Sequence, residues 1–201
     1  MKTRLMLLGA VLMSAALTLP AAAQGLGQRT QRTQAEIAFE QAETDFQKHK
    51  AARDEAQQKC ASNEFQACYE LAEAQRKGLG GSQDFSGAAT NYKKVCAARD
   101  GRGCAGLAYL TVQGRGVTAN AAEGRRLYKQ ACDYGEVSGC AAWGNMAYVG
   151  IGGAKDVHKG TNALNEACEK EYEWACTRVR ELGAFNPEDR PMERMRDMRS
   201  N

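Results

Sequence analysis

Apolar residues recur along this chain at fixed positions of a unit 36 residues long. Two positions are apolar in three successive units: Leu71, Leu107 and Trp143 at the first, and Tyr92, Tyr128 and Leu164 at the second. A third position holds only small residues: Ala88, Gly124 and Gly160. A fixed period of this length is typical of solenoid repeats, in which each unit buries its apolar face against its neighbours.

Glycine-rich segments separate the apolar stretches with the same period. Each contains Gly-x-Gly and then Asp or Asn: Gly78, Gly80 and Asp84; Gly114, Gly116 and Asn120; Gly150, Gly152 and Asp156. Glycine adopts the left-handed conformation that ends a helix, and Asp or Asn accepts hydrogen bonds from the free N–H groups that start the next one. Each unit is therefore predicted to be a hairpin of two helices.

The predicted fold is an all-α solenoid, a right-handed superhelix of αα-hairpins. Its helices are expected at about 65–77, 86–97, 103–113, 121–132, 138–149, 159–170 and 173–182. Residues 28 to 77 contain neither Gly nor Pro, and one helical stripe within them is apolar: Phe39, Ala42, Phe46, Ala56 and Cys60. This pattern predicts a long helix from about Gln34 to Cys60 that caps the N-terminal end of the solenoid.

Eight cysteines follow the same period, with intervals that alternate between 8 and 28 residues. Residues eight apart in one straight helix lie about 12 Å apart, whereas a disulfide needs Cα atoms within about 7 Å, so a helix must end between them. Gly101 and Gly103 lie in one such interval, and Gly135 and Gly139 in another, which indicates turns at these glycines. Eight cysteines allow about 105 pairings. The repeat favours one of them: Cys60–Cys68, Cys96–Cys104, Cys132–Cys140 and Cys168–Cys176.

Metal binding and redox catalysis are the other common roles of multiple cysteines. Structural zinc sites use cysteines about two to four residues apart, and redox-active thiols usually belong to a C-x-x-C motif. This sequence has no C-x-x-C, and its two histidines, His49 and His158, lie far apart. We therefore expect structural disulfides, with no metal and no cofactor.

Residues 1–23 have the three parts of a secretory signal peptide. Lys2 and Arg4 form a short basic region, residues 5–19 are almost wholly apolar, and Ala21 to Ala23 offers a small-residue cleavage site. The apolar run is shorter than the roughly 20 residues that a membrane-spanning helix needs, and no later segment resembles a span. We expect a mature protein that begins near Gln24 in the periplasm or outside the cell, where disulfides persist.

Removal of this segment leaves 25 basic and 24 acidic residues. A domain that binds nucleic acid typically carries an excess of basic residues, so this function is not expected. The remaining chain divides into a capping segment at 24–59, the repeat solenoid at 60–182 and a tail at 183–201. The tail holds Met192, Met195 and Met198 among charged residues, and we expect it to be disordered or a short helix. The protein is expected to be a monomer.

Three strings within the units carry a family resemblance: CAGLAYLTVQGRGV (104–117), AEGRRLYKQACDYG (122–135) and GCAAWGNMAYVGIG (139–152). They resemble the Sel-one-like repeat (SLR), a relative of the tetratricopeptide repeat. The paired cysteines of each unit are similar to the cysteine-rich bacterial Hcp type of that family. The likeness covers about 60–182, although 61–67 and 169–175 lack the turn glycines, as terminal capping units often do.

The resemblance implies two functions of different classes. SLR solenoids generally act as protein-interaction scaffolds, with the first helix of each unit lining a concave groove. Hcp-type proteins are also described as β-lactamases or penicillin-binding proteins. A serine β-lactamase needs an S-x-x-K motif, and no serine here has a lysine three residues later, nor is the string 159–161 the K-T-G of such enzymes. We expect a scaffold, and keep hydrolysis of a β-lactam as the alternative.

In a scaffold, the residues beside the apolar core positions of each first helix face the groove. The candidates are Tyr69, Glu73 and Arg76 in the first unit, Tyr109 and Val112 in the second, and Asn145 and Tyr148 in the third. Tyrosines offer rigid amphipathic contact area, and Asn145 can hydrogen-bond a peptide backbone. The expected partner is a protein or peptide, with a peptidoglycan-derived ligand or a β-lactam as the other choices.

Overall fold

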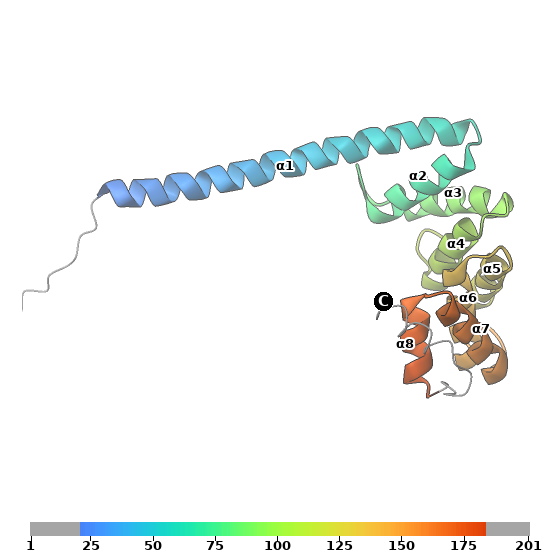
Figure 1. The fold of residues 1–201 in the computed structure, drawn as a ribbon. Coiled ribbons are helices and arrows are strands. Elements are labelled where there is room, and N and C mark those ends of the chain that lie inside the picture. Colours follow the sequence, from blue (N-terminus) through green and yellow to red (C-terminus); the bar gives the residue numbers. More distant parts are fainter. Residues whose placement is uncertain (1–20, 184–201) are drawn as a thin grey trace, which may run out of the picture. The chain divides into compact units, whose positions relative to one another are not determined.

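The computed structural model describes residues 21–183, with side chains from residue 34 onward. Within this range the chain forms eight helices and no strand (Figure 1). Their bounds are α1 Ala21–Ala61, α2 Phe65–Lys77, α3 Phe85–Ala97, α4 Gly101–Gln113, α5 Ala121–Asp133, α6 Val137–Val149, α7 Val157–Glu169 and α8 Glu173–Glu181. The described chain divides between Thr44 and Asp45 into two units, and the helices α2 to α8 belong to the second. The expected signal peptide up to residue 20 and the expected tail after residue 183 lie outside the described residues.

The helices α2 to α8 agree with the predicted ones to within two residues at each end. In contrast, α1 begins at Ala21 and not near Gln34. Residues 21–33 contain no proline to stop the helix. Gly25 and Gly27 weaken it by about 1 kcal/mol each without ending it. The sequence marks only the amphipathic part of this helix, and the helix itself runs further.

The apolar stripe predicted for α1 is buried only at its C-terminal end. Ala56 and Cys60 are buried. Phe39 and Phe46 are 72% and 43% exposed, and Ala42 is exposed as well. The capping contact therefore comes from the last turns of α1.

Four disulfides connect the second helix of each unit to the first helix of the next. The pairs are those predicted, Cys60–Cys68, Cys96–Cys104, Cys132–Cys140 and Cys168–Cys176, with Cα–Cα distances of 4.4 to 4.6 Å. Three of these cysteines, Cys60, Cys68 and Cys104, are almost completely buried, so the disulfides form part of the core. The chain leaves no free cysteine among its described residues.

The turns between the paired cysteines do not depend on the predicted glycines. Their left-handed residues are spaced by the repeat: Asn63 (φ 63°), Arg99 (65°), Gly135 (85°) and Glu171 (62°). The predicted turn residues Gly101, Gly103 and Gly139 lie inside helices, where they are buried. A Cβ on Gly103 would lie 2.6 Å from the Val95 side chain. These three glycines therefore allow close helix packing, and only Gly135 makes a turn.

The longer turns inside each unit follow the predicted pattern. Glycine ends α2, α4 and α6 in the left-handed conformation, and Asp84, Asn120 and Asp156 cap α3, α5 and α7. The second glycine of each Gly-x-Gly also meets the preceding unit, since a Cβ on Gly116 would lie 2.3 Å from the carbonyl carbon of Phe85. These loops therefore help to set the spacing between units.

The two ends of the solenoid carry exposed charged residues where the inner units bury uncharged ones. Glu55 of α1 occupies the repeat position of the buried Asn91 and Leu127 and pairs with Lys59 at 2.6 Å. At the other end, the exposed Arg180 of α8 occupies the position at which Gly144 lets α6 meet α7. Polar outer faces of this kind are what terminal repeats need to remain in water.

We predict that Gly135→Ala lowers the free energy of unfolding by about 1–2 kcal/mol, because a left-handed φ costs an L-residue that much. A Cβ at this position meets nothing within 4 Å, so no clash adds to the loss. The matched control Glu171→Ala should change stability little, because Glu171 already adopts this conformation with a side chain. Urea unfolding of the oxidised proteins measures both. Equal losses in the two variants would contradict this account of the turns.

Candidate functional site

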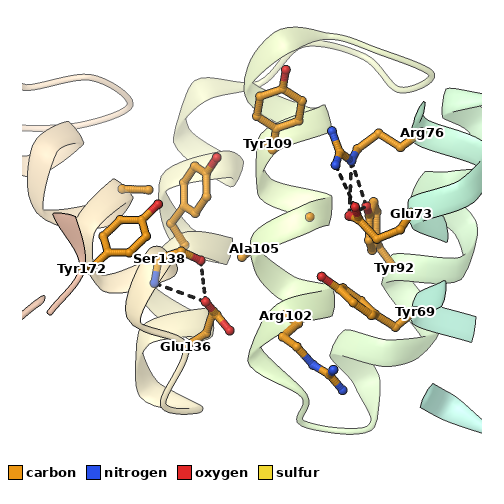
Figure 2. Close-up of a pocket in the computed structure, with 13 residues that line it drawn as sticks. Tyr69, Glu73, Arg76, Tyr92, Arg102, Ala105, Tyr109, Glu136, Ser138 and Tyr172 are labelled. Carbon is orange, nitrogen blue, oxygen red and sulfur yellow. Dashed lines mark hydrogen bonds and ion pairs between the residues drawn. The ribbon is translucent and has the colours of Figure 1, made fainter. Parts of the chain in front are cut away.

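A pocket opens on the face formed by the first helices of successive units, α2, α4 and α6 (Figure 2). Its volume is about 610 Å³. Helices α2 and α3 supply one wall, α6 and the residue before α8 supply the other, and Ala105 and Gly106 of α4 lie between them. Five of the seven tyrosines of the chain line it: Tyr69, Tyr92, Tyr109, Tyr128 and Tyr172. The pocket is therefore aromatic and rich in hydroxyl groups.

A charged network forms the wall on α2 and α3. Arg76 donates from Nη2 to Glu73 at 2.7 Å and from Nε to the Tyr92 hydroxyl at 3.2 Å, and that hydroxyl donates to Glu73. Burial raises the pKa of Glu73, but the hydrogen bonds from Arg76, Lys77 and Tyr92 outweigh it and hold this pKa at about 2. Burial, followed by the Glu73 carboxylate, raises the pKa of Tyr92 well above its usual value. At neutral pH, Glu73 is ionised and Tyr92 is protonated, so the network holds one arrangement.

Glu136 and Ser138 lie on the opposite wall, at the start of α6 (Figure 2). One carboxylate oxygen of Glu136, Oε1, accepts from the Ser138 N–H at 3.2 Å and from the Ser138 hydroxyl at 2.5 Å. Glu136 is half-buried. Within residues 34–183, no basic side chain pairs with it at 4 Å or less. Glu136 thus brings an ionisable group without a cationic partner to the edge of the pocket.

The aromatic part of this wall is also shielded from water. Burial is the main cause that raises the pKa of Tyr128 to about 12, with smaller contributions from Tyr109 and Tyr172. The hydroxyl of Tyr128 is therefore protonated at neutral pH and remains able to donate a hydrogen bond.

The pocket exists because two large side chains of one unit are small in the next. Between α2 and α4, the guanidinium of Arg102 lies over the ring of Tyr69, 4.6 Å from its centroid. The residues 36 positions further on are Ser138 and Ala105, and both line the pocket. The space that a guanidinium and a ring fill in one unit is open in the following one.

Four of the seven predicted groove residues line this pocket: Tyr69, Glu73, Arg76 and Tyr109. Val112 and Tyr148 instead face the second helix of their own unit. A Cβ on Gly124 would lie 2.3 Å from Cγ2 of Val112, and one on Gly160 would lie 2.7 Å from Cβ of Tyr148. The binding role that the sequence predicts for these two residues stays a prediction, outside the pocket.

Asn145, the seventh predicted residue, takes part in a contact between two first helices. Its side-chain oxygen accepts a hydrogen bond from Nε of Arg178 at 2.8 Å. Arg178 also pairs with Glu181 at 3.1 Å. This contact joins α6 to α8, and Asn145 does not line the pocket. Its predicted role in binding a peptide backbone is likewise untested.

Six other polar or aromatic residues line the pocket. Tyr92 and Tyr128 stand at predicted core positions, whereas the sequence pattern does not mark the other four: Arg102, Glu136, Ser138 and Tyr172. Two of them, Glu136 and Tyr172, are helix N-caps that stand 36 residues apart, in register with the N-caps Glu64 and Asp100. The sequence contains this 36-residue spacing. It does not indicate a pocket, because only apolar positions mark the buried side of a helix.

Within residues 21–183, no helix has the length and apolar character needed to cross a membrane. The described residues also contain no group of three or more His, Cys, Asp or Glu placed to hold a metal ion. All eight cysteines are engaged in the four disulfides.

No protein-family model matches this sequence, and no curated protein matches it either. Solved structures do match the fold. A protective antigen of uropathogenic Escherichia coli with an SLR fold is 24% identical, with a TM-score of 0.60 over 63% of this chain and 27% of that protein. A Sel1 repeat protein from Oxalobacter formigenes is 24% identical, with a TM-score of 0.59 over 63% of this chain and 52% of that one. Helicobacter pylori cysteine rich protein B is 23% identical, with a TM-score of 0.53 over 66% of this chain and 95% of its own.

These likenesses define the class of fold, an α/α solenoid of Sel1-like repeats. More particularly, the matching part of this chain covers nearly all of the cysteine-rich Helicobacter protein, whereas it spans about a quarter and a half of the other two. The resemblance found in the sequence is thereby confirmed for the fold.

We predict that Glu73→Gln lowers the free energy of unfolding by about 1–2 kcal/mol at pH 7, after allowance for partial solvent screening. The pKa of Glu73 in the folded protein is about 2, below its ordinary value of 4.5. The ionised form therefore adds stability that is present above pH 4.5 and is lost as the pH falls towards 2. Urea unfolding at neutral pH and near pH 3 measures the difference, with Tyr128→Phe as a control in the same pocket. A loss of equal size at both pH values would contradict the network described above.

Proposed function

We propose that this protein is an interaction scaffold that binds an extended segment of a protein partner across α2, α4 and α6. The observation that supports this function best is the preformed pocket of about 610 Å³, lined by tyrosines from successive units. Its volume lies within the range of about 300–1,000 Å³ that ligand sites occupy. The SLR fold of the solved structures agrees with a scaffold role.

The tyrosines suit an extended peptide in particular. The hydroxyls of Tyr69, Tyr109, Tyr128 and Tyr172 bond to no other group among the described residues that surround them. Each ring offers apolar area, and each hydroxyl can donate to a peptide carbonyl or accept from an N–H. A chain that runs across the pocket would meet Tyr69 of α2, Tyr109 of α4 and Tyr172 before α8.

The proposed setting is the periplasm or the outside of the cell. Disulfides persist in oxidising compartments, whereas the cytosol keeps thiols reduced. Residues 1–23 have the composition of an export signal. A partner in this setting is another exported or envelope protein.

We predict that short peptides selected from a random library on the oxidised protein lose about 10-fold or more affinity for Ala142→Arg, because an arginine side chain would fill the pocket. Tyr109→Ala should also weaken them, through loss of aromatic contact area. The control Ala51→Arg adds the same side chain at an exposed position of α1. Fluorescence anisotropy measures the affinities, and circular dichroism checks the folding of each variant. Selected peptides that bind all four proteins equally would contradict this function.

Hydrolysis of a β-lactam has one candidate nucleophile in the pocket, Ser138. Its hydroxyl donates to Glu136, and the described residues that line the pocket include no lysine and no histidine. An activated serine normally hydrogen-bonds to a general base of that kind. Glu136 caps α6 through the same oxygen, so the arrangement favours a structural role for the pair.

We therefore predict that the oxidised protein hydrolyses a chromogenic cephalosporin no faster than Ser138→Ala does. Steady-state absorbance measurements on the two proteins test this directly. Turnover by the wild-type protein that disappears in Ser138→Ala would identify an enzyme and replace the scaffold function.

A further inference from the structure

We propose that the pocket recognises a basic segment of its partner, with an arginine side chain of that segment bound to Glu136. This inference rests on the proposed scaffold function and names the chemistry of the segment that is bound. Its basis is a comparison between two successive units of the solenoid, whose backbones repeat and whose side chains differ.

The unit that begins at α4 has its own arginine, Arg102, beside the acidic N-cap of that helix. Asp100 caps α4 and accepts hydrogen bonds from Arg102, the shortest of them 2.6 Å long from Nη2. The guanidinium of Arg102 also donates to Gln66 at 2.8 Å and lies over the ring of Tyr69. The acidic N-cap, the arginine and the ring therefore form one compact group.

The next unit keeps the acidic N-cap but lacks the other two members. Glu136 stands in the position of Asp100, Ser138 in that of Arg102, and Ala105 in that of Tyr69. Within the described part of the chain, the second carboxylate oxygen of Glu136 accepts no hydrogen bond, since Ser138 donates only to Oε1. In the open space beside it, Ala105 and Arg102 stand at the positions from which Tyr69 and Gln66 contact the arginine of the preceding unit, and Tyr128 and Tyr172 supply the aromatic walls.

The charges around the pocket favour a cation at this place. Arg102 lies across the groove from Glu136 and interacts with its charge, but the ion pair that Arg102 forms within 4 Å is with Asp100 (Figure 2). Arg76 is balanced by Glu73 in the same way. Glu136 is the carboxylate of the described lining that lacks an ion-pair partner. A neutral ligand would remove water from this half-buried carboxylate without an opposite charge to offset the cost of its desolvation.

Arginine fits the geometry better than lysine. A planar guanidinium can bond a carboxylate through two N–H groups and can also stack on aromatic rings, as Arg102 does on Tyr69. An ammonium group forms a single point contact. We therefore expect the order of affinity arginine, then lysine, then an uncharged side chain of similar length.

The first test changes the peptide and leaves the protein intact. Random peptides are selected on the oxidised protein, and each arginine in a selected peptide is replaced in turn by citrulline, which has the same shape without the charge. One replacement should weaken binding by about 10-fold or more, the usual effect of losing a charge-assisted hydrogen bond. Replacement of the same residue by lysine should have a smaller effect.

The second test changes the protein. Ser138→Arg supplies the missing arginine from within the chain, so it should pair with Glu136 and abolish binding of the peptide. Gln57→Arg is the matched control, because it adds the same charge at an exposed position of α1. Glu136→Gln should remove the preference for arginine over citrulline. Since that change also affects the cap of α6, the peptide series on the wild-type protein gives an answer independent of its folding.

The outcomes separate this inference from the function on which it rests. If the selected peptides lose affinity for Ala142→Arg but bind equally with arginine or citrulline, the scaffold stands and the recognition of a basic segment is wrong. If Ala142→Arg has no effect on any selected peptide, the groove is not the binding site and both fail. A preference for glutamate in place of arginine would also overturn the inference.

Discussion

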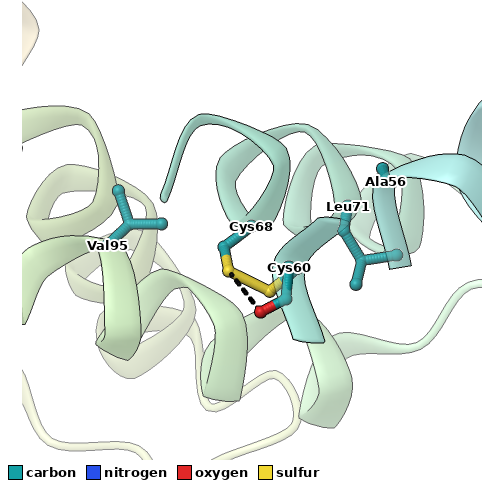
Figure 3. Packing of buried hydrophobic residues seen from close by; sticks show 5 residues of the cluster. All are labelled: Ala56, Cys60, Cys68, Leu71 and Val95. Carbon is teal, nitrogen blue, oxygen red and sulfur yellow. Dashed lines mark hydrogen bonds between the residues drawn. A yellow bond between two sulfur atoms is a disulfide. The ribbon is translucent and has the colours of Figure 1, made fainter. Parts of the chain in front are cut away.

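The close approach of neighbouring helices is the constraint on which the rest of this structure depends. Each disulfide joins two successive helices and holds the Cα atoms of its two cysteines 4.4 to 4.6 Å apart. Around the first of them, Ala56, Leu71 and Val95 form a buried cluster (Figure 3). Within a unit, a Cβ on Gly160 would lie 2.6 Å from the backbone nitrogen of Tyr148. One inserted residue would rotate the following part of a helix by about 100°, so contacts this close require a constant period.

Because the backbone repeats, individual properties of the units come from side chains at equivalent positions. Asp100 and Arg102 neutralise each other in one unit, whereas Glu136 is paired only with a serine in the next. The pocket therefore arises by replacement of large side chains with small ones and needs no irregularity of the fold. The same principle ends the solenoid, since Arg180 occupies a position that must be small wherever another helix packs.

The repeated features of this protein could be predicted from its sequence because each depends on local chemistry. Apolar spacing locates the helices, glycine and Asp or Asn locate their ends, and the cysteine intervals give the disulfides. The turn predicted at Gly101 and Gly103 is wrong, because the presence of glycine in a sequence does not distinguish a left-handed φ from a close helix contact. Asn145 could not be placed, since its partner Arg178 belongs to another helix 33 residues away.

The pocket itself was only partly predictable. Tyr69, Glu73, Arg76 and Tyr109 were identified as groove residues from their place beside the core positions, and they line it. The opposite wall depends on how far the second and third units lie from each other, which no property of Glu136 or Ser138 alone reveals. The pocket depends on the distance between neighbouring units, which only the three-dimensional structure gives.

A crystal structure of the oxidised protein with a selected arginine-containing peptide would test the central claim most directly. The account predicts a guanidinium within hydrogen-bonding distance of the Glu136 carboxylate, with the peptide lying along α2, α4 and α6. A peptide bound on another face of the solenoid, or an uncharged side chain beside Glu136, would contradict it.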